Sequence, residues 1–456
     1  MKEFIVMLDQ MVWGVPMLLL ILGTGMYICV KTRFIQIRLF PAAVRTLLKR
    51  LLTKDSGGTN ISPVQALCTA LAATVGTGNI AGVAGAIAIG GPGAVFWMWA
   101  SAFFGMGLKF AEACLSVRFR KTNQKGELVS GPMYMIEQGM GSRWRWLAAL
   151  YCFFGVFASL GVGNATQINT LIVSVSGVFA SCGMPVGRDF GIACGIALAI
   201  LIGLLMAGGI KRIGFLAEKM VPIAGVLYVL LGLGVLLVRI ENIPAAFRAI
   251  VCGAFNPAAF TGGIVGSAIR SLRVGTARGV FTNEAGMGTA GIAHGSAEGI
   301  SAIQQGMMGL LEVFIDTFLI CTVTALVILC SGVPVVYGQD IGIDLTASAF
   351  SSVYGNWIRV VIALCVCAFS LATVVGWGLY GGRCAQYLIG DQAWRWFVVL
   401  QSIVVVVGAV VGTGTIWTLA EIVNGLMAIP NLICILYLTP ELCGIVRRPN
   451  KSVDFC

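Results

Sequence analysis

The chain has 456 residues, of which 58% are hydrophobic and only 11% are charged, and its formal net charge is +11. Soluble domains carry about twice that charged fraction, so the composition indicates an integral membrane protein and argues against a nucleic-acid-binding protein. The cysteines lie mostly inside apolar segments, which is typical of small buried residues and not of a disulfide framework or a zinc site.

Apolar runs long enough to span a bilayer recur along the chain, since a transmembrane helix needs about 20 apolar residues. They predict an all-α protein of about eleven transmembrane helices, with no soluble domain between them. The expected spans cover approximately residues 12–30, 64–90, 92–118, 147–178, 189–208, 215–239, 259–272, 301–332, 357–380, 396–412 and 415–440. The longest expected connections are 31–63, 119–146, 240–258 and 273–300.

Most lysines and arginines fall on one side of this topology, beginning with the basic segment between Lys31 and Lys54. Arg270, Arg273 and Arg278 are assigned to the same side. Cytoplasmic loops carry an excess of basic residues. The distribution therefore predicts an N-terminus outside the cell and a C-terminus in the cytoplasm.

The second run contains the stretch TVGTGNIAG at residues 74–82. Gly76, Gly78 and Gly82 weaken a helix there, and a break inside a membrane persists only where protein or water satisfies the backbone. Two half-helices that meet at a break offer amide groups to a carboxylate and carbonyls to a cation. The alternative is that these glycines are packing positions of a tight helix pair.

The seventh run is interrupted by glycines as well, in TGGIVGSAIRSL at residues 261–272. Without the first span, ten remain, and each set of five begins with an interrupted run in the opposite orientation. Paired broken helices of this kind point to a transport site between two inverted repeats. The predicted domains are an extra helix and basic loop (1–62), two five-helix repeats (63–240 and 258–441) and a cytoplasmic tail (442–456).

Three motifs carry a family resemblance: VGTGNIAG (75–82), GGPGAVFWMW (90–99) and RGVFTNEAGMG (278–288). They closely resemble the sodium:alanine/glycine symporter family, and the resemblance covers essentially the whole chain. It implies a LeuT-type 5+5 inverted repeat preceded by one extra helix, in the cell (inner) membrane. It also implies a co-transported sodium ion and a small neutral amino acid as substrate. The lipid bilayer is the other expected partner, with no nucleic acid and no obligate protein partner.

Residues around the first break are the leading candidates for binding. The V-G-x-G-N pattern at 75–79 is similar to the first core helix of neurotransmitter:sodium symporters, where unwound amides hold the substrate carboxylate and the Asn helps to bind sodium. The corresponding amides here belong to Thr77, Gly78 and Asn79. The carbonyls of Ala72, Thr74 and Val75 could serve a cation or the substrate ammonium, because hard cations prefer oxygen ligands.

Polar residues in two other spans complete the expected site. Ser370 and Thr373 share a helical face and match positions that supply sodium hydroxyls in the LeuT-type fold; the alternative is back-bonding to their own helix. Gln167 would lie beside the substrate by resemblance, or else form an interhelical hydrogen bond. By resemblance, Trp377 would form an aromatic wall that limits substrate size, whereas an ordinary core tryptophan is the alternative.

Glu312 and Asp316 are four residues apart near the middle of the eighth run. Intramembrane carboxylates are functional candidates, so they could coordinate a cation or accept a proton. Alternatively they pair with an arginine or face a water-filled vestibule.

Other charged residues are interpreted more simply. Glu112 and Lys109 are expected to form an ion pair at the membrane edge, and His294 is expected in a loop. Asn283 and Glu284, near Arg278, are interpreted as a charged gate in a cytoplasmic loop.

These features predict a secondary active transporter that couples sodium entry to uptake of alanine or glycine by alternating access. The alternative is a proton-coupled amino-acid permease of the same fold, with Glu312 or Asp316 as the proton carrier. A membrane enzyme would require clustered His, Asp or Cys near one interface, and the sequence shows no such cluster. A passive channel is disfavoured because it needs no paired broken helices.

Overall fold

The computed structural model describes residues 7–8, 11–52, 60–339, 342–411 and 413–447, apart from the side chains of 413–417. Within these residues, eight helical segments are long and apolar enough to cross a membrane. They are α7 (Ala94–Arg118), α9–η4–α10 (Arg145–Leu160, Gly161–Ala165, Thr166–Ser181), α11 (Arg188–Ala207), α12 (Gly209–Val238), α17–η6–α18 (Ala302–Val313, Phe314–Cys321, Thr322–Cys330), α20 (Ile358–Ile389), α21 (Ala393–Val410) and α22 (Thr413–Arg447).

Three further spans are shorter or interrupted. The apolar helix α2 (Val15–Lys31) precedes the others. The first interrupted span consists of α5 (Pro63–Thr74), the 3-10 turn η1 (Thr77–Asn79) and α6 (Ala81–Gly90). The second consists of α15 (Ala268–Asn283) and α16 (Thr289–His294). With these three, the described part of the chain contains the roughly eleven spans predicted from the sequence.

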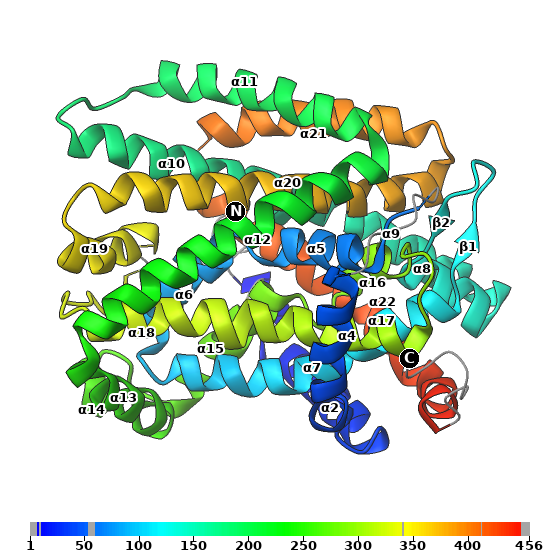
Figure 1. The fold of residues 1–456 in the computed structure, drawn as a ribbon, viewed down its shortest axis with the longest axis horizontal. Coiled ribbons are helices and arrows are strands. Elements are labelled where there is room, and N and C mark those ends of the chain that lie inside the picture. The colour runs from blue at the N-terminus through cyan, green and yellow to red at the C-terminus, as the bar shows by residue number, and fades with distance from the viewer. Residues whose placement is uncertain (1–6, 9–10, 53–59, 340–341, 412, 448–456) are drawn as a thin grey trace.

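The connections carry short elements at both ends of the bundle (Figure 1). One end holds α13, α14 and α19, and the other holds a β1–β2 hairpin in which Lys121 pairs with Val129. The connecting elements are α3 (Ile35–Arg38), α4 (Phe40–Leu52), β1 (Lys121–Thr122), β2 (Leu128–Val129), α8 (Pro132–Met135), η2 (Ile136–Met140), η3 (Ser142–Trp144), η5 (Ile240–Asn242), α13 (Ile243–Phe255), α14 (Ala258–Thr261) and α19 (Gly342–Tyr354).

Local sequence explains where α5 and α17 begin. Ser62 caps α5, accepting a hydrogen bond from the Gln65 amide while the Gln65 side chain accepts one from the Ser62 amide. Ser301 caps α17 by accepting from the Gln304 amide. A serine that satisfies an otherwise free amide fixes the first turn of a helix. Small residues then allow close packing: a Cβ on Gly309 of α17 would lie only 2.8 Å from the Lys109 carbonyl oxygen of α7.

The second interruption differs from its predicted position. A break was expected within 261–272 and a connection over 273–300, but α15 continues to Asn283 and the break follows at 284–288. The three arginines of α15 lower its hydropathy, so the segment looks like a loop in the sequence. It is a helix because its other face packs on α6 and α7, where a Cβ on Gly90 would lie 3.0 Å from the Val274 side chain.

This packing also corrects part of the basic-residue distribution. The start of α15 lies where α6 ends, which is the face opposite to the start of α5 and the basic segment before it. Arg270 and Arg273 therefore lie on the other side from the one assigned to them. Most of the basic residues still fall on the first side, and the orientation of the termini stays a prediction. The tail from residue 448 lies outside the described residues.

Candidate functional site

The side chain of Asn79 fixes the backbone conformation of the first break. After α5 ends, Val75 and Gly76 are extended, with ψ angles of 93° and −152°. The Asn79 Oδ1 accepts a hydrogen bond of 2.8 Å from the Gly76 amide. Asn79 is fully buried, so the protein itself satisfies backbone that would otherwise be unpaired inside the bundle.

Gln167 reaches this break from α10. Its Oε1 accepts from the Thr77 amide at 3.3 Å and from the Thr77 hydroxyl at 3.0 Å. A Cβ built on Gly76 would lie 2.7 Å from Thr373 Oγ1 and 3.2 Å from Gln167 Oε1. The structure thus brings together residues from α5, η1, α10 and α20 that are far apart in the sequence.

The oxygen atoms expected to bind sodium also lie close together. The Thr373 hydroxyl donates to the Ala72 carbonyl at 2.9 Å. Ser370, one turn earlier on α20, is fully buried, and its hydroxyl has no hydrogen-bond partner among the described residues. Val75 lies at the end of α5. Thr74 is at the break, but its hydroxyl donates back to the Ala70 carbonyl of its own helix at 3.2 Å.

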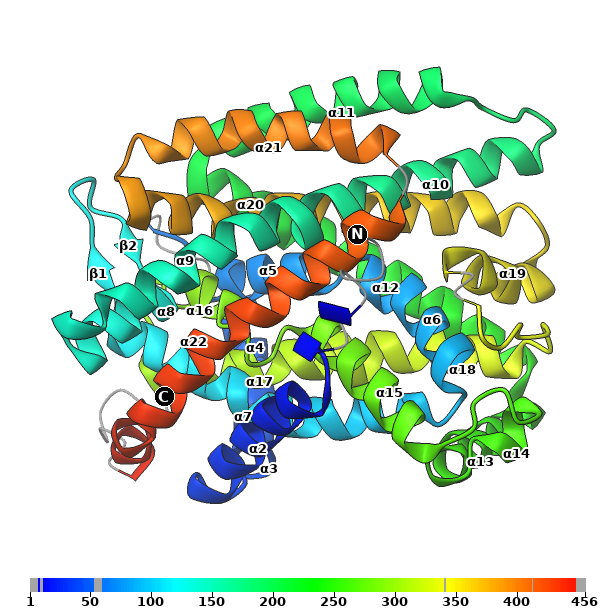
Figure 2. The same cartoon turned by 180° about the vertical axis from the view of Figure 1, so that it is seen from behind.

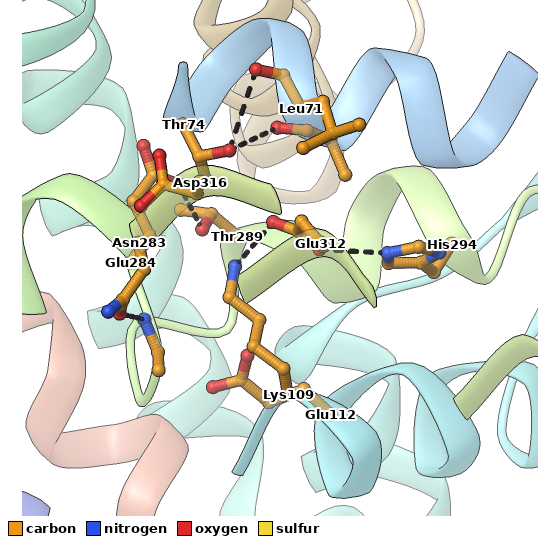
Figure 3. Close-up of polar contacts among 12 residues, drawn as sticks. Leu71, Thr74, Lys109, Glu112, Asn283, Glu284, Thr289, His294, Glu312 and Asp316 are labelled. Atoms are coloured by element: carbon orange, nitrogen blue, oxygen red, sulfur yellow. Dashed lines mark hydrogen bonds and ion pairs between the residues drawn. The ribbon is translucent and has the colours of Figure 1, made fainter. Parts of the chain in front are cut away.

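Asp316 and Glu312 belong to different clusters. Asp316, in the π-helical segment η6, accepts a 2.6 Å hydrogen bond from Asn79 Nδ2 and therefore contacts the first break. Glu312 lies between Lys109 and His294, with an Nζ–Oε1 distance of 2.8 Å and an Nε2–Oε2 distance of 2.9 Å (Figure 3). Pairing with a basic residue was one of the alternatives for these two carboxylates. Glu312 is paired in this way, although its partner is a lysine and not an arginine.

Two simple interpretations of charged residues are wrong. Lys109 does not pair with Glu112 at the membrane edge: it is fully buried and directs its ammonium to Glu312 (Figure 3). His294 is not in a loop. It ends α16, is fully buried, and its Nδ1 accepts a 2.6 Å hydrogen bond from the Gln305 side-chain amide. Helix packing that no local pattern reveals places both residues in the interior.

Glu112 instead holds the second break. The backbone turns there through left-handed conformations, with φ of 54° at Glu284, 92° at Gly286 and 79° at Gly288. Glu112 Oε1 accepts from the amides of Gly286 and Gly288 at 2.9 and 3.0 Å, and from Asn431 Nδ2 at 2.8 Å. One carboxylate oxygen from α7 thereby satisfies the amides released by the break.

Trp377 connects α20 to this second break. Its indole donates to Glu284 Oε1 at 2.7 Å, and the Thr289 hydroxyl donates to Glu284 Oε2 at 2.6 Å. Trp377 also packs on the π-helical segment before Gln167, where a Cβ on Gly163 would clash with it. Asn283 and Glu284 are therefore buried inside the bundle, so their expected position in a cytoplasmic loop is wrong, and their role as a gate stays a prediction.

From the sequence, Lys109, Glu112 and Glu284 were not expected to lie buried inside the bundle. The available signal was their position in or beside apolar runs, where ionisable residues are rare and usually face the bundle interior.

Two interrupted helices held beside one buried polar site, within a bundle of about eleven spans, define a multi-pass membrane transporter. The fold is similar to that of MhsT, solved in complex with L-phenylalanine, with a TM-score of 0.58 over 86% of this chain and 99% of that chain. Sequence identity to MhsT is 13%, so the likeness concerns the fold, and it confirms the predicted LeuT-type architecture.

The chain belongs to the sodium:alanine symporter family, whose profile matches residues 1–452. It is 39% identical to the sodium/alanine symporter AgcS of Methanococcus maripaludis, over 98% of this chain and 96% of AgcS. It is 34% identical to the probable sodium/glutamine symporter GlnT of Bacillus subtilis, over 94% of this chain and 87% of GlnT. The family consists of sodium-coupled amino-acid symporters, which are transporters and not enzymes, and the resemblance seen in the sequence is confirmed.

Proposed function

We propose that this protein couples sodium entry to the uptake of small neutral amino acids, alanine and glycine, by alternating access. The observation that carries the proposal is the first break, where Thr77 contacts Gln167, Asn79 contacts Asp316, and Thr373 contacts Ala72. Backbone amides, two neutral amide side chains, uncharged hydroxyl and carbonyl oxygens and one carboxyl group therefore converge on one buried place.

The substrate carboxylate would bind the amides of Thr77, Gly78 and Asn79, as expected where backbone donors are exposed by an interrupted helix. Two of these amides already have partners: the Thr77 amide donates to Gln167 Oε1 at 3.3 Å, where the Thr77 hydroxyl also donates at 3.0 Å, and the Asn79 amide donates to the Gly76 carbonyl at 3.3 Å. A carboxylate that takes over the Thr77 donors would free this oxygen to accept from the substrate ammonium. Gln167 would then recognise the amino-acid backbone and not its side chain.

Sodium would bind the carbonyls of Ala72 and Val75 with the hydroxyls of Ser370 and Thr373. Hard cations prefer such oxygen ligands. The unpartnered Ser370 hydroxyl supports this assignment, because a buried polar group left unpaired is costly unless something else satisfies it. Asp316 beside Asn79 is the candidate for a second cation.

Trp377 would set the size limit of the substrate. It is 1% exposed, and its position is fixed by Glu284 on one side and by Gly163 on the other. We expect alanine and glycine to compete for uptake, and leucine and phenylalanine not to compete. Trp377→Ala should admit larger amino acids or weaken alanine binding. Trp377→Phe keeps most of the ring and should preserve the size limit, so unchanged selectivity in both variants would return Trp377 to a purely structural role.

The direct test is uptake of labelled alanine and glycine by purified protein in proteoliposomes. Uptake should require an inward sodium gradient and should persist when the proton gradient is dissipated with an ionophore. Empty liposomes under the same gradients provide the control. Accumulation without any ion gradient would contradict active symport.

A proton-coupled permease is the second candidate, and Asp316 is the observation that favours it. A buried carboxylate that contacts the break at 2.6 Å from Asn79 could carry a proton to the substrate site. Uptake driven by a pH gradient without sodium, and abolished by Asp316→Asn, would support this candidate over sodium symport.

A further inference from the structure

A cavity lies away from the broken helices, where α2 and α22 both end. It has a volume of about 700 Å³ and is lined by Tyr27 and Lys31 of α2, Arg118 of α7 and residues of α22 from Thr439 to Arg447. A second hollow of about 360 Å³ shares Lys31 and Arg447 with it and continues to Arg38. We call these two adjoining hollows the basic groove. Both views of the molecule show α2 at the periphery of the bundle (Figures 1 and 2).

The basic groove has a large excess of positive charge. Five cationic side chains line it: Lys31, Arg33, Arg38, Arg118 and Arg447. The carboxylate among the lining residues is Glu441, which pairs with Arg118 at 3.0 Å. Both partners are well exposed, with 56% and 42% of the side-chain surface accessible. Such a cluster favours an anionic ligand, and the exposed ion pair can exchange its partner for that ligand.

The turn that carries part of this charge is strained. Arg33 and Phe34 are consecutive non-glycine residues in the left-handed region, with φ of 55° and 52°. Strained residues persist where the surrounding structure supports them and are frequent at binding sites. This turn places Arg33 beside Lys31 at the lip of the basic groove.

The surfaces that lead to the basic groove are apolar. On α2, Leu19, Met26 and Val30 are exposed at 66%, 50% and 56% and form a stripe that ends beside Lys31. On α22, Leu436 and Tyr437 are exposed at 37% and 50% just before the groove. In a membrane protein, exposed apolar faces of this kind contact acyl chains. A ligand of the groove can therefore be anionic at one end and apolar at the other.

We propose that the basic groove binds the phosphate headgroup of an anionic phospholipid, whose acyl chains lie along the exposed faces of α2 and α22. The groove is at the ends of two spans, which is the level of lipid headgroups, and basic pockets between spans recognise such headgroups. The bound lipid would join α2, the helix outside the two predicted repeats, to α22.

Native mass spectrometry of the purified full chain tests this proposal. The protein is titrated with phosphatidylglycerol and with phosphatidylcholine of the same acyl chains. The groove variant is Lys31→Gln/Arg118→Gln/Arg447→Gln. A control variant removes the same charge from exposed positions elsewhere, Lys125→Gln/Arg143→Gln/Lys219→Gln. Sodium-dependent alanine uptake and the melting temperature verify that each variant is folded.

We expect the groove variant to bind phosphatidylglycerol about tenfold or more weakly than the parent, since each basic residue near a headgroup adds to the affinity. Phosphatidylcholine binding and the control variant should match the parent. If the groove variant does not fold, Arg33→Gln/Arg38→Gln should weaken phosphatidylglycerol binding about fivefold by the same reasoning.

Unchanged phosphatidylglycerol affinity in a folded groove variant would overturn the proposal. A loss of equal size in the control variant would overturn it as well, because the effect would then reflect overall charge. Displacement of phosphatidylglycerol by inorganic phosphate, as effective as displacement by excess phosphatidylglycerol, would assign the groove to a free anion instead of a lipid.

Discussion

Asn79 forms hydrogen bonds on both sides of its side-chain amide. Its Oδ1 accepts from the Gly76 amide at 2.8 Å, and its Nδ2 donates to Asp316 at 2.6 Å. Asn79 therefore fixes the shape of the first break and at the same time holds an acidic residue from η6 against it. A hydrophobic side chain of similar volume could do neither.

We expect Asn79→Ala to weaken alanine binding about tenfold or more, because a buried group left unpaired costs about 1–3 kcal/mol. Calorimetric titration of the purified variant in sodium buffer measures this change. Asn169→Ala is the matched control, since Asn169 of α10 donates to the carbonyls of Gly408 and Val411 at 3.3 and 3.0 Å, away from the break. Equal affinity in Asn79→Ala and the parent would exclude a role in binding.

The buried ion pair of Lys109 and Glu312 should behave as a unit. Both side chains have no exposed surface, and removal of one partner leaves an uncompensated charge that costs about 3–5 kcal/mol. We expect Lys109→Met and Glu312→Gln each to lower the melting temperature strongly. The double variant should lose less than the sum of the two.

The exposed pair of Arg118 and Glu441 provides the comparison for thermal unfolding. Its N–O distance is 3.0 Å, similar to that of the buried pair, but water screens it. Arg118→Ala should therefore change stability by only about 0–1 kcal/mol. A strictly additive double variant at Lys109 and Glu312 would show that the two side chains are not coupled.

At the scale of elements, the two breaks are stabilised in different ways. The first is satisfied mainly from within, by Asn79, with support from Gln167. The second is satisfied from neighbouring helices, because Glu112 of α7 and Asn431 of α22 both contact Gly286. If α16 moves relative to α7, these hydrogen bonds therefore either break or persist because the side chains of Glu112 and Asn431 follow the movement.

Glu112 should consequently be required as an acceptor more than as a charge. Glu112→Gln keeps an oxygen that can accept from Gly286, Gly288 and Asn431, whereas Glu112→Ala leaves the Gly286 and Gly288 amides unpaired at about 1–3 kcal/mol each. We expect Glu112→Ala to reduce alanine uptake about tenfold or more and Glu112→Gln to retain most of it. Initial uptake rates, normalised to protein in the proteoliposomes, measure the difference. Equal loss in both variants would mean that the negative charge itself is needed.

At the scale of the whole molecule, the candidate sodium site exists only because α5 and α20 lie side by side. Thr373 and Ala72 are 301 positions apart in the chain, yet their oxygens are separated by 2.9 Å. Ser370 then faces the same region with a hydroxyl that has no partner among the described residues.

Ser370→Ala should raise the sodium concentration for half-maximal uptake several-fold, because one neutral oxygen ligand contributes on the order of 1 kcal/mol. The melting temperature without sodium should hardly change, since no hydrogen bond within the described structure is lost. Ser402→Ala is the control, because that hydroxyl donates only to Val398 of its own helix at 2.9 Å. Sodium dependence that is identical in Ser370→Ala and the parent would remove Ser370 from the site.

The sequence by itself determined the features that depend on local composition. Hydropathy located the uninterrupted spans, because a bilayer requires about 20 apolar residues in a row. Most ends agree within a few residues, but α12 begins at Gly209 where 215 was expected, and α20 and α22 continue to Ile389 and Arg447 where 380 and 440 were expected. The glycines of 74–82 predicted the first break, since they weaken a helix wherever they occur. The motifs around both breaks were long enough to identify the family.

Only the tertiary structure decided which polar residues meet. Hydropathy misplaced the second break because the arginines of α15 resemble a loop, whereas burial of its other face against α6 and α7 keeps it helical. Lys109 and Glu112 are one turn apart, yet Lys109 pairs with Glu312, 203 positions away, and Glu112 binds the second break. Inside a bundle each charge must find a partner, and the partner is chosen by helix packing, which no local pattern in the chain encodes.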